Sequence, residues 1–336
     1  MKDSVEIPVV DLAPYFEGTD AGKASVARAV DEACCAIGFL VISGHGIDET
    51  LIESMREVSR RYFDLPVDEK LRLKMPTDCY RGYTPIGTEG LAASLDQVAP
   101  PDLKESFSIG PVDAADDEYH SKSRAGPFFA TNMWPEQPAE MREIWEAYYR
   151  VMESLATSLM RIFALALDLP EHWFDDKVDR HITNFSVIHY PEPKGEPIPG
   201  QLRAGAHTDY GSLTILQKDE ADGGLQVQRD DGSWIDVPNL PGTFVVNLGD
   251  LMAEWTNDRW RSTMHRVVLP DMDRRGQSDR YSMPFFHQPN YDAVVECIPT
   301  CCSEDNPARY GKTTSGEHVV MKINKHRAPD QVGETV

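Results

Sequence analysis

Two histidines and an aspartate provide the side chains of a candidate metal site. His207 and Asp209 are separated by one residue in GAHTDYGSL, and His265 lies in STMHRVVLP. We predict both stretches as strands, in which side chains alternate between faces, so His207 and Asp209 should point the same way. Two imidazoles and one carboxylate on one side of a metal leave three coordination positions open. That arrangement is typical of iron(II) oxygenases, whereas zinc is more often tetrahedral.

The H-x-D triplet alone is a weak indication, because histidines are common in packed and surface positions. The chain has ten histidines, and we assign such positions to seven of them: His45, His120, His172, His181, His287, His318 and His326. The order in which H-x-D, a distant histidine and an R-x-S pair follow one another is more informative than the triplet.

Arg280 and Ser282 form that last pair, on one face of a further predicted strand. A guanidinium binds a carboxylate at two points, and a hydroxyl adds a third hydrogen bond. The pair therefore predicts a receptor for a carboxylate tail close to the metal. 2-Oxoglutarate has such a tail, and its keto-acid end can chelate iron, which leaves one position for dioxygen.

The first half of the chain has the periodicity of helices with a few short strands. We predict an edge strand over 5–12, since Pro8 interrupts it, and a helix over 21–36 followed by a buried strand over 39–42. Asp48 is expected to cap a helix that runs to Phe63. Residues 75–127 are rich in Gly and Pro and are interpreted as a long irregular binding loop or lid. A long amphipathic helix is predicted over 138–167.

The second half changes character at about Asp179, where short strands alternate with turns rich in Gly, Pro, Asn and Asp. This pattern favours an antiparallel sandwich or jelly roll. Gly249 and Asp250 are assigned to a turn, Asn247 to a hydrogen-bonding position at a strand end, and 315–323 to a weak helix. The predicted fold class is α+β, with a jelly-roll core in 179–295, a helical N-terminal region in 1–178 and a C-terminal extension in 296–336. No linker separates these segments, so one integrated unit is expected.

Composition limits the partners. The formal net charge of -22 disfavours nucleic acid and anionic lipid, so a small-molecule substrate is expected by elimination. The sequence has no apolar run of about 18 residues and no secretion signal, which predicts a cytoplasmic protein that does not enter a membrane. The six cysteines contain no C-x-x-C pair and are predicted to be reduced thiols, with Cys34 and Cys35 packed on a helix. The oligomeric state is not determined by these patterns.

Several stretches together resemble the isopenicillin N synthase-like family of iron(II)- and 2-oxoglutarate-dependent dioxygenases over nearly the whole chain. They are IPVVDLAPYF, AIGFLVISGHGID, GAHTDYGSLTIL, VVNLGDLM, STMHRVV and RYSMPFFHQPNYDA. RGYTPIGTEG and DLKESFSIG look closest to thymine 7-hydroxylase-type members. The resemblance implies a double-stranded β-helix core. It also implies oxidation, in most cases hydroxylation, of an unactivated C–H bond of a small molecule, while 2-oxoglutarate is decarboxylated to succinate.

The resemblance also implies site residues. Iron is expected at His207, Asp209 and His265, and 2-oxoglutarate at Arg280 and Ser282 with Tyr190 as a further contact. Candidate residues of the substrate pocket are Arg81, Tyr83, Ser186, Tyr210 and Phe286.

Two positions depart from the family pattern. Ser186 stands where many members carry an Arg that helps to bind the pyrimidine in the thymine hydroxylase, and Ile188 stands where many plant members carry Asn. The substrate therefore stays open. Two other functions also stay open: an iron oxidase or cyclase of the isopenicillin N synthase type that does not use 2-oxoglutarate, and a metal-binding sensor without turnover.

Overall fold

Two β-sheets packed face to face form the centre of the computed structural model. It describes residues 6–76, 79–91, 100–122, 124–192, 198–219, 224–270 and 278–326. The larger sheet has, in spatial order, β1 (Val9–Asp11), β2 (Phe39–Ser43), β10 (Phe244–Leu248), β7 (Leu213–Lys218), β12 (Arg280–His287), β5 (Asn184–Tyr190), β4 (Glu105–Ile109) and β3 (Gly82–Thr84). The smaller sheet has the order β6 (Ala204–His207), β11 (His265–Val267), β8 (Leu225–Gln228) and β9 (Trp234–Asp236). A short pair, β13 (Val294–Val295) and β14 (Thr313–Thr314), lies apart from both.

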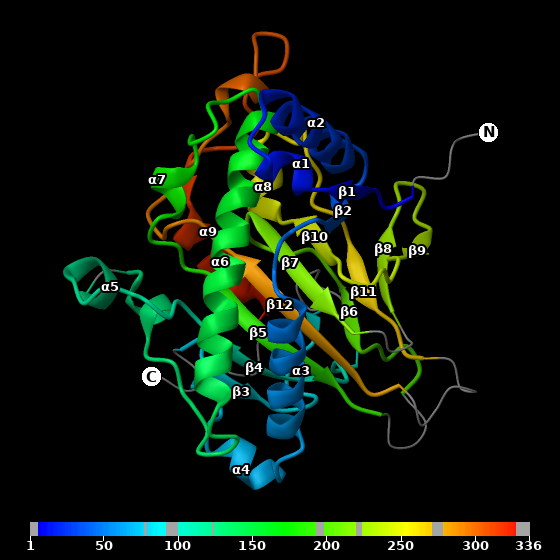
Figure 1. Cartoon of the computed structure of the whole chain (residues 1–336), viewed down its shortest axis with the longest axis vertical. Coiled ribbons are helices and arrows are strands. Elements are labelled where there is room, and N and C mark those ends of the chain that lie inside the picture. Colours follow the sequence, from blue (N-terminus) through cyan, green and yellow to red (C-terminus); the bar gives the residue numbers. More distant parts are fainter. Residues whose placement is uncertain are drawn as a thin grey trace, which may run out of the picture.

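The helices of the described segments are α1 (Ala13–Phe16), α2 (Asp20–Ala36), α3 (Glu49–Phe63), α4 (Val67–Leu71), α5 (Glu118–Lys122), α6 (Met141–Ala166), α7 (Asp175–Val178), α8 (Asp250–Trp255) and α9 (Ser315–His326), with short 3-10 turns at Gly126–Phe129 and Pro299–Cys301. Among them, α3 and α6 cover the face of the larger sheet that points away from the smaller sheet (Figure 1). No helix of the described segments is long and apolar enough to cross a bilayer.

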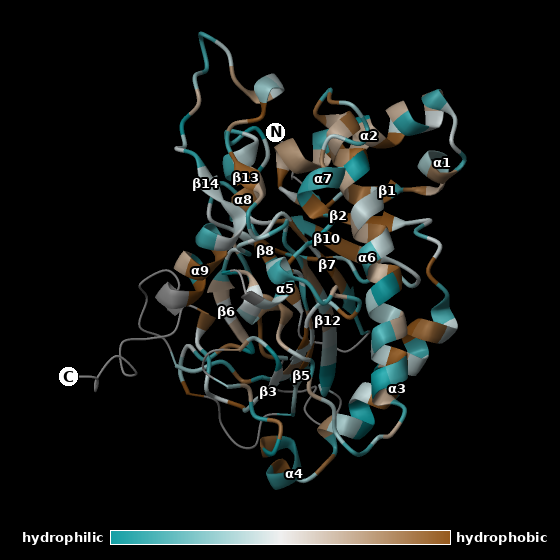
Figure 2. Ribbon diagram, turned by 90° about the vertical axis from the view of Figure 1, so that its left-hand side faces the viewer, coloured by the Kyte–Doolittle hydropathy of each residue, from teal (hydrophilic) through white to brown (hydrophobic). Residues whose placement is uncertain are grey.

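The central helix α6 separates the solvent from the larger sheet. It packs against α2 and α3, and α3 and α6 lie side by side in Figure 1 and Figure 2. Its buried aromatic residues Trp145 and Tyr149 contact Phe185 and Phe285 of the sheet. A second apolar core, which includes Phe39, lies between the two sheets. The apolar core between the sheets is thus formed mainly by strand residues, and α6 packs on the outer face of the larger sheet.

Most expected elements are present. The predicted helix over 21–36 is α2, and the predicted helix over 138–167 is α6. Asp48 caps α3, since its carboxylate accepts a hydrogen bond from the Thr50 N–H. The predicted edge strand is β1, which pairs in parallel with β2 and begins one residue after Pro8. The weak helix near the C-terminus is α9. The predicted N-terminal region, 1–178, and the predicted jelly-roll core, 179–295, interlock, because β1 to β4 extend the same sheet as β5, β7, β10 and β12.

The interpretation of 75–127 as an irregular loop is wrong, because this stretch contributes β3 and β4 to the larger sheet. Glu105 on β4 explains the error, since a buried carboxylate is unexpected in a strand. Its oxygens accept hydrogen bonds from Lys70 Nζ at 3.1 and 2.9 Å, from His189 Nδ1 at 2.8 Å and from the Tyr83 hydroxyl. This buried network ties α4, β3, β4 and β5 together.

We expect Glu105→Gln to lower the free energy of unfolding by about 3–5 kcal/mol, because the substitution leaves the buried Lys70 ammonium without its counter-charge. Urea unfolding of the variant measures this loss. Asp113→Asn is the matched control, since its exposed pair with Arg150 should be worth about 1 kcal/mol or less. Equal losses in both variants would contradict this role of the network.

The same network makes that difference depend on pH. Burial alone would raise the pKa of Glu105, but its hydrogen bonds to His189, Tyr83 and Lys70 hold this pKa below the ordinary value. A lowered carboxyl pKa stabilises the folded state above the unfolded pKa, about 4.3 for Glu, and this contribution is lost as the pH falls through the folded pKa. The gap between wild type and Glu105→Gln should therefore shrink as the pH falls below about 4.

Candidate metal and cosubstrate site

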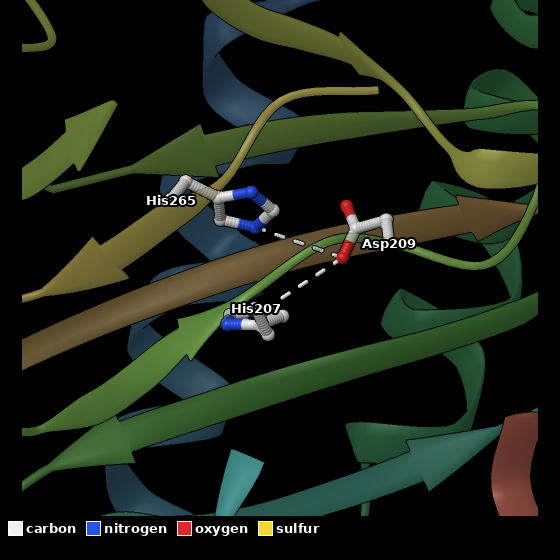
Figure 3. A group of neighbouring side chains, drawn as sticks. All are labelled: His207, Asp209 and His265. Carbon is white, nitrogen blue, oxygen red and sulfur yellow. Dashed lines mark ion pairs between the residues drawn. The ribbon is translucent and has the colours of Figure 1, made fainter. Parts of the chain in front are cut away.

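Two of the three candidate metal ligands lie on the smaller sheet, facing the larger one. His207 is the last residue of β6 and is the direct register partner of His265 on β11. Partners in an antiparallel pair point to the same face, which brings the two rings to 4.3 Å between centroids. The sequence predicted Asp209 on the same strand as His207, but Asp209 lies in the connection from β6 to β7. Its Oδ1 still lies 3.8 Å from His207 Nε2 and 3.6 Å from His265 Nε2 (Figure 3).

Backbone carbonyls fix how the two imidazoles present their nitrogens. His207 Nδ1 lies 2.7 Å from the Gly205 carbonyl oxygen, and His265 Nδ1 lies 3.1 Å from that of Thr263. Each Nδ1 therefore carries the proton and donates it, which leaves the Nε2 lone pair for a metal. Burial, followed by the neighbouring His265, lowers the pKa of His207 to about 3, so its ring is neutral.

The Asp209 carboxylate is oriented by two donors. Its Oδ2 accepts hydrogen bonds from the Thr214 hydroxyl at 2.6 Å and from Asn247 Nδ2 at 2.7 Å. Burial alone would raise the Asp209 pKa, but the two histidines and these donors hold it below the ordinary value. The opposite oxygen, Oδ1, is left to face both imidazoles. The three ligand atoms lie within 4.8 Å of one another, and this set of two imidazole nitrogens and one carboxylate oxygen fits iron(II).

Asn247→Ala should weaken iron(II) binding and turnover by about 10- to 100-fold, because it removes one of the two donors that hold the carboxylate. Anaerobic equilibrium dialysis measures the affinity. Asn239→Ala is the control, since the Asn239 amide donates to the Asp219 carbonyl and Asn239 does not line the cavity. Unchanged iron affinity in Asn247→Ala would rule out this orienting role.

Asp250 is hydrogen-bonded to Thr208, the residue between His207 and Asp209. The assignment of Gly249 and Asp250 to a turn is wrong, because Asp250 is the first residue of α8 and Gly249 its N-cap. The Asp250 carboxylate accepts hydrogen bonds from Thr208 at 3.2 Å, from Ser262 at 2.7 Å and from Lys322 of α9 at 2.6 Å. It therefore links the residue between two candidate ligands with the C-terminal helix.

A cavity of about 260 Å³ opens between the two sheets beside the metal ligands. Arg280 and Ser282 line it from β12, and Tyr190 lines it from β5 as the register partner of Arg280. Lys104 lines it as well and was not identified from the sequence, because it lies in the stretch interpreted as a loop. Burial opposes the charge of Lys104, but Glu89 at 2.9 Å and Asp102 hold its pKa above the ordinary value. This end of the cavity is cationic and suits a carboxylate.

The candidate pocket residues divide into two groups. Arg81, Tyr210 and Phe286 line the cavity. Tyr83 does not, because it packs in the core on the helical side of the sheet and bonds Glu105. Ser186 does not line the cavity either, since its hydroxyl is paired with that of Ser108 at 2.7 Å. Two residues of α9 that the sequence analysis did not identify, Val319 and Ile323, form part of the wall.

Comparison with known proteins agrees with this geometry. A family model described as the 2OG-Fe(II) oxygenase superfamily matches residues 182–289, and one described as the N-terminal region of non-haem dioxygenases in morphine synthesis matches residues 7–137. The 2-oxoglutarate-Fe(II) type oxidoreductase hxnY of Emericella nidulans is 34% identical over 91% of this chain and 86% of its own length. The chain belongs to the 2OG-Fe(II) oxygenase superfamily.

Two further similar proteins indicate the range of the family. A homoarginine-6-hydroxylase of Oryza sativa subsp. japonica is 33% identical, over 96% of this chain and 97% of its own. The crystal structure of Neurospora crassa thymine 7-hydroxylase in complex with 2-oxoglutarate and thymine has a TM-score of 0.84 and 32% identity, with 96% and 98% of the two chains covered. The protein is thus an iron(II)- and 2-oxoglutarate-dependent dioxygenase with a jelly-roll fold. Neither the oxidase without 2-oxoglutarate nor the sensor without turnover is favoured.

Proposed function

We propose that this dioxygenase hydroxylates a small molecule, that His207, Asp209 and His265 bind its iron, and that Arg280, Ser282 and Tyr190 bind 2-oxoglutarate. The observation that carries the proposal is that one cavity is lined both by the three ligands and by the Arg280–Ser282 pair. Lys104 would add a second cation at the carboxylate end.

Each group of residues would have a separate task. The histidines and Asp209 hold the metal, which when bound supplies the oxidising power for the C–H bond. Arg280 and Ser282 anchor the distal carboxylate of the cosubstrate, since a guanidinium and a hydroxyl together satisfy it. Apolar side chains, among them Leu216, Leu225 and Val267, line the cavity and exclude water from it. No side chain needs to act as a general base.

The three segments would divide this work. Segment 179–295 supplies the proposed metal ligands and the Arg280–Ser282 receptor. Segment 1–178 supplies Arg81 and Lys104, and segment 296–336 supplies Val319 and Ile323 of α9. Substrate choice would then depend on residues from all three segments, whereas iron binding would depend on one.

We also propose that small molecules, rather than nucleic acid or a membrane, are its partners, and that it works in the cytoplasm. The net charge of -22 and the size of the cavity support the first point. The six cysteines, all with free thiols, support the second.

A spectroscopic experiment tests the proposal. Iron(II) and 2-oxoglutarate added to the protein without oxygen should produce a visible metal-to-ligand charge-transfer band, and His207→Ala should abolish it. His172→Ala is the matched control, because this exposed histidine pairs with Asp175 and does not line the cavity. If wild type gives no band, the proposed site is wrong. Once the band is established, release of succinate in air identifies molecules that stimulate turnover.

A further inference from the structure

The cavity extends past the metal across the larger sheet, and strand register defines its direction. Thr214, which bonds the metal carboxylate, pairs with Phe286 on the next strand, and Phe286 pairs in turn with Asn184. All three side chains line the cavity. From β7 to β5 this row covers two strand spacings, about 10 Å. The row therefore leads from the metal, across the Phe286 ring, to Asn184.

Arg81 lies at the end of this row. Its Nη1 donates to the Asn184 side-chain oxygen at 3.2 Å and to the Tyr80 carbonyl at 2.9 Å, and its Nη2 donates to the Phe128 carbonyl. Its side chain lines the cavity and is only 1% exposed. Arg280 is at the other end of β12, six residues or about 20 Å along the strand from Phe286. Arg81 is thus separate from the proposed cosubstrate receptor.

Arg81 has no acidic partner among the residues that the structure describes. Its guanidinium donates to one amide oxygen and two carbonyl oxygens, and its Nε–H has no acceptor among these residues. Lys104, by contrast, has Glu89 at 2.9 Å. Burial lowers the pKa of Arg81 to about 10, so the guanidinium stays charged at neutral pH. A buried cation without a counter-charge is costly, and a bound anion would remove that cost.

The surroundings of Arg81 are aromatic and apolar. Tyr80 and Phe128 stack on each other with centroids 4.8 Å apart, and both line the cavity, as does Ile182. The Ser186 hydroxyl is hydrogen-bonded to that of Ser108 and accepts a hydrogen bond from the Asn184 amide. This end of the cavity combines one cation with flat apolar walls.

We propose that the primary substrate is a small organic anion with a flat apolar body, and that Arg81 binds its negatively charged group. The body packs over Phe286, between Arg81 and the metal, so the oxidised carbon lies within about 10 Å of the anionic group. This inference rests on the proposed function, since it assigns the substrate class of the same site.

The test compares carboxylates with their neutral amides on the complete enzyme. Benzoate, phenylacetate, benzamide and phenylacetamide are titrated anaerobically into the protein saturated with iron(II) and 2-oxoglutarate, so that Arg280 is already occupied. Perturbation of the charge-transfer band gives dissociation constants, and succinate release in air gives turnover. We expect each carboxylate to bind wild type at least about 10-fold more tightly than its amide.

Arg81→Gln should remove this preference and weaken carboxylate binding by about 10- to 100-fold, while the band itself persists. Arg150→Gln, at an exposed surface pair, should keep the preference. Equal binding of acids and amides by wild type overturns the proposal without any variant, and so does a preference that survives in Arg81→Gln. Absence of the band in wild type is a different failure, that of the proposed iron and cosubstrate site.

Discussion

Asp209→Ala is expected to reduce iron(II) affinity and turnover by more than about 100-fold. Loss of a metal ligand should exceed the cost of losing a residue that only orients one, which is about 10- to 100-fold. The reason is geometric: Asp209 Oδ1 faces both histidine Nε2 atoms, and no other described acidic side chain joins this cluster. Anaerobic equilibrium dialysis with iron(II) and succinate formation measure the two losses.

The control for this prediction is Asp231→Ala, in the exposed turn before β9, where the carboxylate accepts hydrogen bonds from Ser233. It should bind iron as wild type does. Circular dichroism establishes that both variants fold. Iron affinity within about tenfold of wild type in Asp209→Ala would remove Asp209 from the ligand set.

Arg280→Gln is expected to have the second largest effect, on the cosubstrate alone. Removing one partner of a buried charge pair costs about 2–5 kcal/mol, so the KM for 2-oxoglutarate should rise at least about 30-fold. Arg280 is 2% exposed and lines the cavity next to Ser282 and Tyr190. Steady-state succinate formation at varied 2-oxoglutarate measures the change.

Two further variants sharpen this result. Arg280→Lys keeps the charge but loses the two-point geometry, so its KM should lie between wild type and Arg280→Gln. Arg142→Gln, on the exposed face of α6, should not change the KM. A KM for 2-oxoglutarate that stays at the wild-type value in Arg280→Gln would exclude Arg280 as the receptor. Iron affinity should be unaltered in all three variants.

The cluster of candidate metal ligands was predictable, because its evidence lies in residue type and order. Selecting His207, Asp209 and His265 required no knowledge of strand boundaries. The prediction that Asp209 lies on the strand was wrong, but the three side chains still lie together. Arg280 and Ser282 were predictable as a pair because period 2 on one strand is a local property.

Residues whose roles depend on long-range register were not predictable. Asn247 was expected to form a hydrogen bond, but that its partner is Asp209 follows from the alignment of β10 with β7. Strands β3 and β4 were missed because Glu105 and Lys104 look like surface residues until their buried partners are known. The Arg81 site depends on contacts with Asn184 and Phe128, which are 103 and 47 residues away in the chain.

The direct pairing of His207 with His265 has a consequence for assembly of the smaller sheet. The pairing between β6 and β11 is irregular, because the register shifts between His265 and Val267. A slip of one residue along β11 would turn His265 to the opposite face, and the metal could then no longer be shared with His207. Iron bound by both histidines would therefore favour the native alignment of β6 and β11 over an alignment shifted by one residue. Without iron, the smaller sheet would lose this contribution to its correct pairing.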